Sequence, residues 1–435
     1  MIRRTVPQKT ISKESSLSGV GLHTGENVNL TFKPAPSNTG LVFIREDIEG
    51  DNSIEANIKF ISNTDRGTNL DNGSFRIHTS EHVLAALTGS DIDNCYISLD
   101  GPEVPIMDGS SKFFIEAIEE AKIVEQNALR EEFIPSEKIS FKCEETGSNL
   151  SLIPDDNYSI DTKIDFNTEV LGTQTASIND ITDFKEEISS SRTFSFLHEL
   201  ETLLEHGLIK GGDLNNAIVY VDKPLADSNM ERLKKAFNKT SISVTPNGIL
   251  DNLSLHHPNE AARHKLLDVI GDLALIGMKI RGKIIAEKPG HAVNAKFAQL
   301  VSESIKADRK NIIPIINFDK KPLMDSNQIM NVIPHRPPFL LIDEVLELSE
   351  SHVIGLRRVE QSESWVKGHF PGAPVMPGVL QVEFMAQAGG VLVLNTVPDP
   401  ENYLTFFMKM DKCKFKDTVV PGDILICKLE LVSPI

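Results

Sequence analysis

Apolar and polar positions repeat with two different periods along the chain, which predicts a fold built from both strands and helices. Short apolar runs predict strands at residues 28–33, 41–44 and 95–99. Runs with apolar residues three and four positions apart predict helices at residues 79–88, 112–121, 196–206 and 261–278. Short apolar strands surround one long hydrophobic helix near the C-terminus. We therefore predict the α+β class.

The helix predicted at 261–278 carries more polar residues in register than packing requires. Its apolar face is already complete, with Leu266, Leu267, Val269, Ile270 and Leu273. His264, Asp268 and Asp272 follow one another at four-residue spacing, so they stack on one side of the helix. Such a row is either a solvated ladder of weak ion pairs or part of a binding site, and the spacing leaves both open.

Changes in composition predict the domain boundaries. A mixed, charged and proline-interrupted segment at 301–326 indicates a connection between domains. A weaker change near 125–137 indicates that the first 300 residues form two lobes. The resulting division is a first lobe at 1–130, a second lobe at 131–305, a linker at 306–321 and a separate domain at 322–435.

The bulk composition is that of a globular protein and argues against several classes. The 435 residues are 40% hydrophobic and 24% charged, and the formal net charge of −18 argues against nucleic acid as a partner. No apolar run approaches the ~20 residues of a membrane span, and the start MIRRTVPQKTISKESS lacks the core of a signal peptide. Together with four widely spaced cysteines, this predicts a cytoplasmic protein without disulfides or a transmembrane segment.

Histidines and carboxylates in the N-terminal part suggest a metal site. His82 begins a predicted helix beside Glu81, His264 and Asp268 lie on the helix at 261–278, and His291 follows Gly290. Two imidazoles and one carboxylate suffice to bind Zn2+ with one position open for water, which suits amide hydrolysis. Glu81 is then a candidate base and His291 a candidate acid. Each residue also has an ordinary structural explanation, such as a helix-dipole contact for Glu81.

A family resemblance adds to this chemistry. The resemblance is carried, in order, by GVGLHTGENV (19–28), TSEHVLAALTG (79–89), GPEVPIMDGSS (101–111), SRTFSF (191–196), GLIKGGDLNNAIV (207–219), ARHKLLDVIGDLALIG (262–277) and KPGHAVN (288–294). These segments resemble UDP-3-O-acyl-N-acetylglucosamine deacetylase, the zinc amidase of lipid A synthesis. The resemblance implies a sandwich of two β/α lobes with the active site between them.

Matched position by position, the resemblance implies the metal ligands and the catalytic pair. His82, His264 and Asp268 become the Zn2+ ligands, although Fe2+ can occupy the same set. Glu81 becomes the general base, and His291 becomes the acid that protonates the glucosamine nitrogen.

The resemblance also implies supporting residues. Thr193 hydrogen-bonds the oxyanion, Lys265 adds positive charge beside the metal, and Asp272 orients His291. Residues expected to contact the UDP-sugar lipid are Asp165, Phe166, Phe194 and Lys288. The segment IDFNTEVLGTQ (164–174) departs from the family, which often has a histidine-proline pair there.

The long helix predicted at 379–394 is apolar on nearly every side, so we expect it to be buried on all faces. Pro377 and Gly378 mark its start. Glu383 lies within it, and burial favours the neutral form of a carboxyl group, which makes Glu383 a candidate proton carrier. The alternative is that Glu383 emerges at the surface or pairs with an arginine such as Arg336.

A second resemblance covers this part of the chain. PHRPPFLLIDEV (334–345), GHFPGAPVMPGVL (368–380) and EFMAQAGG (383–390) resemble the hot-dog-fold β-hydroxyacyl-(acyl carrier protein) dehydratases. The resemblance implies that His369 abstracts the α-proton, Glu383 helps expel the hydroxyl, and the Gly378 N–H polarises the thioester carbonyl. In this family the catalytic residues come from two subunits, which implies a homodimer, commonly grouped into a hexamer.

The same resemblance makes acyl carrier protein a partner. Four lysines cluster near the end of the sequence, namely Lys409, Lys412, Lys414 and Lys416. They either dock the acidic carrier protein or protect a solvated edge strand. Hot-dog domains normally continue with further strands beyond the position of Ile435, so we expect the C-terminal strands to be missing.

Together these features predict a bifunctional enzyme, a zinc-dependent deacetylase followed by a (3R)-hydroxyacyl-carrier-protein dehydratase. One alternative treats 322–435 as a catalytically silent oligomerisation or acyl-binding module. Another makes it a thioesterase, because the hot-dog fold supports both reactions.

Overall fold

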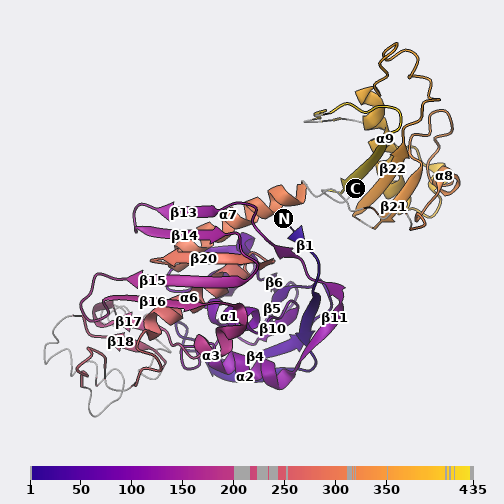
Figure 1. Ribbon diagram of the computed structural model, residues 1–435. Coiled ribbons are helices and arrows are strands. Elements are labelled where there is room, and N and C mark those ends of the chain that lie inside the picture. The colour runs from indigo at the N-terminus through magenta and orange to yellow at the C-terminus, as the bar shows by residue number, and fades with distance from the viewer. Residues whose placement is uncertain are drawn as a thin grey trace. The chain divides into compact units, whose positions relative to one another are not determined.

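The structure is a computed structural model in which the chain forms two compact units, Met1–Asn311 and Ile312–Ile435 (Figure 1). It describes residues 2–199, 216–222, 234, 243–250, 253–310, 316, 318, 320–349, 351–406, 409–410, 413–415 and 417–431. Both units contain helices and strands, so the predicted mixture of the two is confirmed.

The first unit contains a five-stranded sheet in the order β3-β4-β10-β5-β6. Its strands are β3 (Ser15–Val20), β4 (Asn27–Pro34), β5 (Leu41–Arg45), β6 (Ser53–Glu55) and β10 (Cys95–Leu99). The central strand β10 runs antiparallel to β4 and parallel to β5. Helix α1 (Glu81–Gly89) precedes β10 in the chain, and helix α2 (Lys112–Ala121) follows it and packs on β3 and β4.

A second five-stranded sheet repeats this topology, in the order β13-β14-β20-β15-β16. Its strands are β13 (Ile139–Cys143), β14 (Ser148–Ile153), β15 (Tyr158–Asp165), β16 (Thr173–Ile178) and β20 (Gly282–Glu287). The central strand β20 is antiparallel to β14 and parallel to β15. Helix α6 (Glu260–Ala274) precedes β20, and helix α7 (His291–Lys310) follows it. The first unit therefore consists of two structurally similar halves, and α1 of the first half corresponds to α6 of the second.

Short elements complete the first unit. They are β1 (Ile2–Arg3), β2 (Pro7–Ile11), β7 (Ile61–Asn63), β8 (Asn69–Asp71), β9 (Arg76–Ile77), β11 (Ile123–Leu129), β12 (Glu132–Phe133), α3 (Phe184–Glu187), β17 (Phe194–Phe196), β18 (Ile218–Tyr220), β19 (Lys279–Ile280) and two 3-10 helices at 58–60 and 181–183. Strand β12 pairs with both β1 and β19, so residues from the start, middle and end of the unit meet in one small sheet.

Helices α1 and α6 pack directly against each other at Gly271. A Cβ atom at this position would lie 2.1 Å from the carbonyl oxygen of Glu81. Only glycine allows the two backbones to approach this closely, and the approach brings the first turn of α1 beside the middle of α6.

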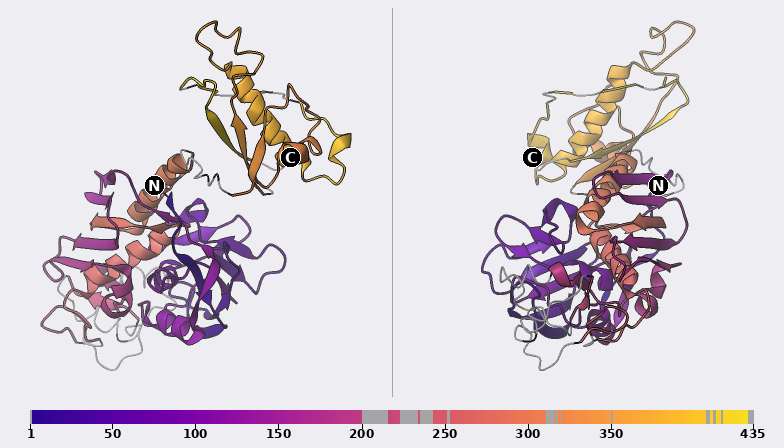
Figure 2. Two further views of the ribbon diagram at one scale, coloured as in Figure 1. Left: turned by 45° about the vertical axis from the view of Figure 1, so that its right-hand side comes forward. Right: turned by 90° about the vertical axis from the view of Figure 1, so that its left-hand side faces the viewer.

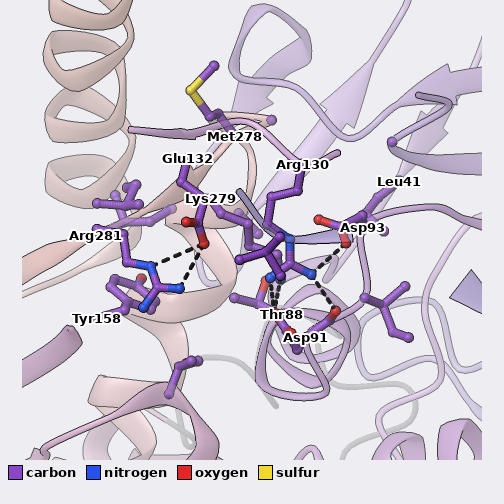
Figure 3. Close-up of a pocket in the computed structure, with 18 of the residues that line it drawn as sticks. Leu41, Thr88, Asp91, Asp93, Arg130, Glu132, Tyr158, Met278, Lys279 and Arg281 are labelled. Carbon is purple, nitrogen blue, oxygen red and sulfur yellow. Dashed lines mark hydrogen bonds and ion pairs between the residues drawn. The ribbon is translucent and has the colours of Figure 1, made fainter. Parts of the chain in front are cut away.

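A cavity of about 370 Å3 lies at the C-terminal ends of the same two helices, and charged side chains form part of its lining (Figure 3). Arg130 pairs there with Asp91 and Asp93 at 2.6 Å each, and Arg281 pairs with Glu132 at 3.0 Å. Lys279 also pairs with Asp91 at 3.6 Å, and this ion pair links the two halves of the unit.

The second unit has a three-stranded antiparallel sheet, β21-β22-β23, formed by Glu344–Leu348, His352–Arg358 and Ile424–Glu430. Helix α9 (Gly378–Leu394) packs on β22 and β23 (Figure 2). A short helix α8 (Ser326–Met330) and a 3-10 helix (Pro400–Asn402) complete the described elements.

Most of the periodic segments form the predicted elements. The strands predicted at 28–33, 41–44 and 95–99 are β4, β5 and β10, and the helices predicted at 79–88, 112–121 and 261–278 are α1, α2 and α6. The helix predicted at 196–206 lies largely outside the described residues. Helix α7 continues to Lys310, past residue 301 where the predicted connection begins, because Val301 and Ile305 pack into the core.

The prediction that the long C-terminal helix is buried on all faces is wrong for the single chain. Phe384, Ala388 and Val391 are buried against the sheet, but Val379 is 74% and Met385 41% exposed. The sheet covers only one side of α9, which leaves an apolar face open.

Candidate functional sites

The N-terminus of α1 supplies a buried carboxylate and a buried imidazole. Glu81 is the first residue of the helix and His82 the second, and both are at least 96% buried. The Glu81 carboxylate accepts a hydrogen bond of 2.9 Å from the backbone N–H of Thr68. Burial raises the pKa of Glu81 to about 7, although the nearby His291 opposes the shift. This carboxylate is suited to exchange a proton near neutral pH.

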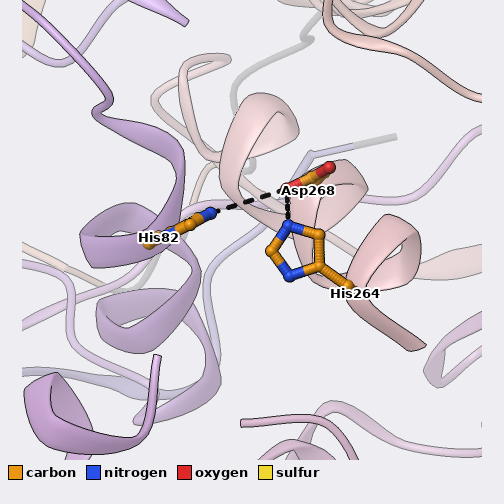
Figure 4. Close-up of side chains that lie close together, drawn as sticks. All are labelled: His82, His264 and Asp268. Atoms are coloured by element: carbon orange, nitrogen blue, oxygen red, sulfur yellow. Dashed lines mark ion pairs between the residues drawn. The ribbon is translucent and has the colours of Figure 1, made fainter. Parts of the chain in front are cut away.

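His82 meets His264 and Asp268 of α6 in a closely packed cluster (Figure 4). Asp268 Oδ1 lies 3.4 Å from His264 Nε2 and 3.9 Å from His82 Nε2, and the two imidazole rings are 5.1 Å apart at 87°. All three side chains are buried. Among the described residues, this is the only group of three or more histidine, cysteine or acidic side chains arranged to hold a metal ion.

The donor set fits a zinc ion. Two ligand atoms held about 2.1 Å from one tetrahedral Zn2+ lie about 3.4 Å apart, close to the observed separations. Asp268 Oδ1 is buried yet has no hydrogen-bond partner in the described part of the chain. An unsatisfied carboxylate oxygen facing two imidazole nitrogens is costly unless a cation lies between them. Burial lowers the pKa of His82 to about 3, which keeps this imidazole neutral and able to bind a metal.

His264 is oriented by a neighbouring loop. Its Nδ1 lies 3.0 Å from the carbonyl oxygen of Ser191. A carbonyl oxygen can only accept a hydrogen bond, so Nδ1 is the donor, and Nε2 is left to face Asp268. The next residue, Arg192, forms a buried ion pair of 2.8 Å with Glu260 in the first turn of α6. Glu260 also accepts a hydrogen bond from the Arg192 backbone N–H at 3.1 Å. The pairing of Arg192 with Glu260 was not predicted from the sequence, although Arg192 lies inside the SRTFSF segment.

His291, the first residue of α7, is held by Asp272. Its Nδ1 lies 3.0 Å from Asp272 Oδ2, which also accepts a hydrogen bond of 2.8 Å from Asn294. Burial lowers the pKa of His291, but the carboxylates of Asp272 and Asp268 outweigh it and raise the pKa to about 9. His291 is therefore protonated at neutral pH, as a general acid must be.

The remaining residues predicted for this site lie around the metal cluster. Lys265 donates to Asp268 Oδ2 at 2.9 Å, and its ammonium group lies 5.6 Å from the ring centre of Phe194. Phe194 is also 6.4 Å from the His264 ring. The structure thus brings the predicted lysine and phenylalanine next to the metal ligands. Thr193 is fixed by its backbone N–H, which donates to Gly109 at 2.8 Å.

An aromatic cluster extends from Phe194 toward the predicted substrate contacts. Phe166 lies 5.5 Å from both Phe194 and Phe196, measured between ring centres. Asp165 and Lys288 form an ion pair of 3.2 Å. The four predicted substrate-contact residues therefore form two adjacent pairs. Most of the motif at 207–219 lies outside the described residues.

In the second unit, His369 and Glu383 occupy different surroundings. His369 Nδ1 lies 2.7 Å from the carbonyl oxygen of Val375, so Nδ1 carries the proton and Nε2 keeps its lone pair. The Glu383 side chain is 25% exposed, so it emerges at the surface rather than being fully buried. Its partners are Gln387 at 2.9 Å and His335 at 3.5 Å. Arg336 donates instead to the carbonyls of Ile333 and His335.

Gln387 was not identified from the sequence, although it follows Glu383 by one helical turn. It is 1% exposed, and its amide oxygen accepts from the backbone N–H of Leu341 at 2.7 Å. Its amide nitrogen donates to the Phe339 carbonyl at 2.9 Å as well as to Glu383. Gln387 thus ties Glu383 to the PHRPPFLLIDEV segment.

Two further expectations concern the whole chain. The four cysteines are free, and none of the described helices is both long enough and apolar enough to cross a membrane. Of the lysines predicted to dock a carrier protein, Lys412 and Lys416 lie outside the described residues.

Comparison with known proteins identifies the family. Residues 8–238 and 228–303 match the family model for UDP-3-O-acyl N-acetylglycosamine deacetylase (LpxC), and residues 333–433 match that of a FabA-like domain. A protein of Bacteroides thetaiotaomicron named bifunctional enzyme LpxC/FabZ is 44% identical over 98% of this chain and 93% of the relative. A protein of the same name from Porphyromonas gingivalis is 45% identical over 98% of this chain and 92% of the relative.

A further relative matches about two thirds of the chain. A UDP-3-O-acyl-N-acetylglucosamine deacetylase of Myxococcus xanthus is 39% identical over 68% of this chain and 86% of the relative. The two family models follow each other in the order of the two structural units, and the nearly full-length relatives carry both. The chain therefore belongs to the bifunctional LpxC/FabZ enzymes, with an LpxC-type deacetylase domain followed by a FabA-like domain.

Proposed function

We propose that the first unit deacetylates UDP-3-O-(3-hydroxyacyl)-N-acetylglucosamine for lipid A synthesis. The second unit dehydrates (3R)-hydroxyacyl-acyl carrier protein to the trans-2-enoyl product for fatty acid synthesis. The observation that carries the first assignment is the convergence of His82 from α1 with His264 and Asp268 from α6. In this proposal the sheets around β10 and β20 belong to two lobes of a sandwich, with α1 and α6 at the site between them.

The deacetylase residues divide the proton transfers between an acid and a base. Zn2+ held by His82, His264 and Asp268 would supply Lewis-acid polarisation of the amide carbonyl and a more acidic water. Glu81, with its pKa near 7, takes a proton from the attacking water. His291 is protonated because its pKa is about 9, and it gives a proton to the departing glucosamine nitrogen.

Five side chains support these transfers or bind the substrate. Asp272 keeps the His291 imidazolium in place through Nδ1, which leaves Nε2 to face the leaving nitrogen. Thr193 donates a hydrogen bond to the developing oxyanion, and Lys265 adds a positive charge beside it. Phe166 and Phe194 offer adjacent flat surfaces to the uracil or sugar ring.

The ion pair of Asp165 with Lys288 is half-exposed, so it can open toward a ligand. In the bound state Lys288 contacts the diphosphate and Asp165 contacts the uridine. A diphosphate outcompetes a single carboxylate for the lysine because it carries more negative charge.

The proposed dehydratase chemistry depends on which ring nitrogen of His369 carries the proton. Because Nδ1 donates to Val375, the lone pair of Nε2 is available to remove the α-proton of the thioester. Glu383 assists loss of the β-hydroxyl as water, with Gln387 fixing its carboxylate. The Gly378 N–H at the start of α9 polarises the thioester carbonyl.

Partners complete the proposed second site. The exposed apolar face of α9, with Val379 and Met385, is suited to a second copy of this unit, so we assign a dimer-based homo-oligomer, up to a hexamer. Lys409 and Lys414 contribute to the surface that receives the acidic acyl carrier protein. We propose a cytoplasmic location, because four free cysteines fit a reducing compartment.

A two-activity assay of the full chain tests the assignment. Deacetylation of the UDP-sugar lipid and dehydration of 3-hydroxyacyl-carrier protein are measured for the unmodified chain, His264→Ala and His369→Ala. Each variant is expected to lose only its own activity. Dehydration that survives in His369→Ala would refute the second site. An unmodified chain that deacetylates without dehydrating would leave the second unit as a silent module, and thioester hydrolysis would identify a thioesterase.

A further inference from the structure

Thr68 connects the proposed base and the proposed acid of the deacetylase. We propose that Thr68 is a positioning residue whose hydroxyl fixes Asp272, and through it His291, while its backbone N–H fixes Glu81. This inference rests on the deacetylase function proposed above. It adds a residue to which the sequence analysis gave no role.

The polar groups of Thr68 are all committed to the site. The residue is 1% exposed and immediately precedes β8. Its backbone N–H donates to Glu81 Oε2 at 2.9 Å, and its hydroxyl donates to Asp272 Oδ1. Its carbonyl accepts hydrogen bonds from the Ser80 N–H at 3.1 Å and the Ser80 hydroxyl at 2.8 Å. Ser80 directly precedes α1, so Thr68 is anchored to the helix that carries Glu81.

The hydroxyl proton of Thr68 has only one acceptor that fits the whole network. Its oxygen lies near Asp272 Oδ1 and also 3.3 Å from His291 Nδ1. An ionised carboxylate can only accept hydrogen bonds, so both the hydroxyl and His291 Nδ1 donate to Asp272. The hydroxyl therefore holds one carboxylate oxygen, and His291 holds the other together with Asn294.

This division of donors prevents rotation of the Asp272 carboxylate. Without the Thr68 hydroxyl, Oδ1 loses this donor, and only the two donors on Oδ2 oppose rotation of the carboxylate about its Cβ–Cγ bond. The His291 ring is held through Oδ2, so it would turn as well. Its Nε2, now 3.9 Å from the metal ligand Asp268, would leave the direction of the metal cluster.

The two roles of Thr68 reside in different atoms, which allows them to be separated. Substitution of the side chain leaves the backbone N–H that binds Glu81. Thr68→Val removes only the hydroxyl at nearly constant shape, whereas Thr68→Ser retains it. Thr10 provides a matched control, because its buried hydroxyl donates to the Asn94 carbonyl at 2.7 Å in the same unit but away from the site.

The test compares these variants as full-length, zinc-loaded protein. Thr68→Val is expected to lower kcat for deacetylation by about 10-fold or more, the usual cost of losing a hydrogen bond to a charged group, with KM within about twofold. Thr68→Ser and Thr10→Val are expected to stay within about threefold of the unmodified chain. In an Asp272→Asn background, Thr68→Val should have little further effect, because residues that act as a unit are not additive.

A second readout separates this inference from the proposed function. In the metal-free chain with 15N-labelled histidine, the hydrogen-bonded Nδ1–H signal of His291 should be lost or moved in Thr68→Val and retained in Thr68→Ser. An unchanged signal in Thr68→Val, or equal kcat losses in the valine and serine variants, would overturn the positioning role. An inactive unmodified chain with the expected signals would instead refute the deacetylase function.

Discussion

Replacing Gly271 with alanine tests whether the close contact of α1 and α6 builds the metal site. The added Cβ would lie 2.1 Å from the Glu81 carbonyl oxygen and 2.8 Å from its carbonyl carbon, both backbone atoms that cannot turn away. Ordinary contact begins at 3.4 Å, so the helices must separate by about 1.3 Å. His82 moves with α1, and its Nε2 would then lie about 5 Å from Asp268 Oδ1 instead of 3.9 Å.

The separation has a calculable consequence for metal binding. Zinc ligand atoms about 2.1 Å from the ion require neighbours about 3.4 Å apart, so a gap near 5 Å cannot be closed without strain. We expect the affinity for Zn2+ to fall by about 10- to 100-fold, the range seen when support of a metal ligand is lost. Overpacking is expected to cost about 1–3 kcal/mol of stability, offset in part by the better helix propensity of alanine, about 1 kcal/mol.

The assay is zinc titration of the metal-free chain against a chromogenic chelator, with urea unfolding of the same samples. Gly389→Ala in α9 is the matched control, because it also places alanine inside a helix but meets nothing closer than the Leu429 side chain at 3.5 Å. The control should keep full zinc affinity and full stability. Wild-type zinc affinity in Gly271→Ala would refute the argument that this glycine sets the ligand spacing.

Two further predictions concern ion pairs at opposite ends of the same helices. Arg192→Lys removes the two-point contact with Glu260 that fixes the Ser191 carbonyl, so the affinity for zinc should fall about 10-fold. Arg130→Lys is an equally buried change beside Asp91 and should leave the zinc affinity unchanged. Equal losses of affinity in the two variants, measured by titration against a chelator, would contradict a role of Arg192 in orienting His264. Burial opposes ionisation of Asp91, but Lys279, Lys9 and Arg130 lower its pKa from 3.8 to about 2. The resulting stability is present above pH 4 and lost as the pH falls toward 2, so Asp91→Asn should flatten the loss of unfolding free energy measured in urea over that range.

The parts of the fold that were predictable from the sequence are those set by local pattern. Helix α2 occupies the predicted residues 112–121, because its apolar positions recur with helical spacing and its tertiary contacts do not oppose this local preference. The residues of the proposed metal cluster were predictable only when taken together. The prediction combined His82, the polar residues at four-residue spacing on α6 and the family resemblance. The spacing on α6 could not reveal that His82 comes from a helix some 180 residues earlier in the sequence.

The residues that escaped prediction act through contacts between distant segments. Thr68 lies outside any periodic run, and its role depends on Asp272, which is 204 positions away. Gln387 lies on the same helical face as Glu383, but its positioning role depends on hydrogen bonds with the backbone of Phe339 and Leu341. The open face of α9 could not be predicted, because the helix has apolar residues on every side. This pattern is the same whether a sheet of the same chain or another molecule covers a given face.

The internal repeat explains why the proposed metal ligands come from two helices. Each half of the first unit places two strand pairs before a helix, a central strand and a second helix, so α1 and α6 hold equivalent positions in their sheets. Neither helix carries a complete ligand set, since α1 contributes His82 while α6 contributes His264 and Asp268. If these residues bind a metal ion as proposed, binding requires both halves to be folded and docked at Gly271. Bound zinc should in turn stabilise the pairing of the halves, because a ligand that binds only the docked state adds its binding free energy to that state.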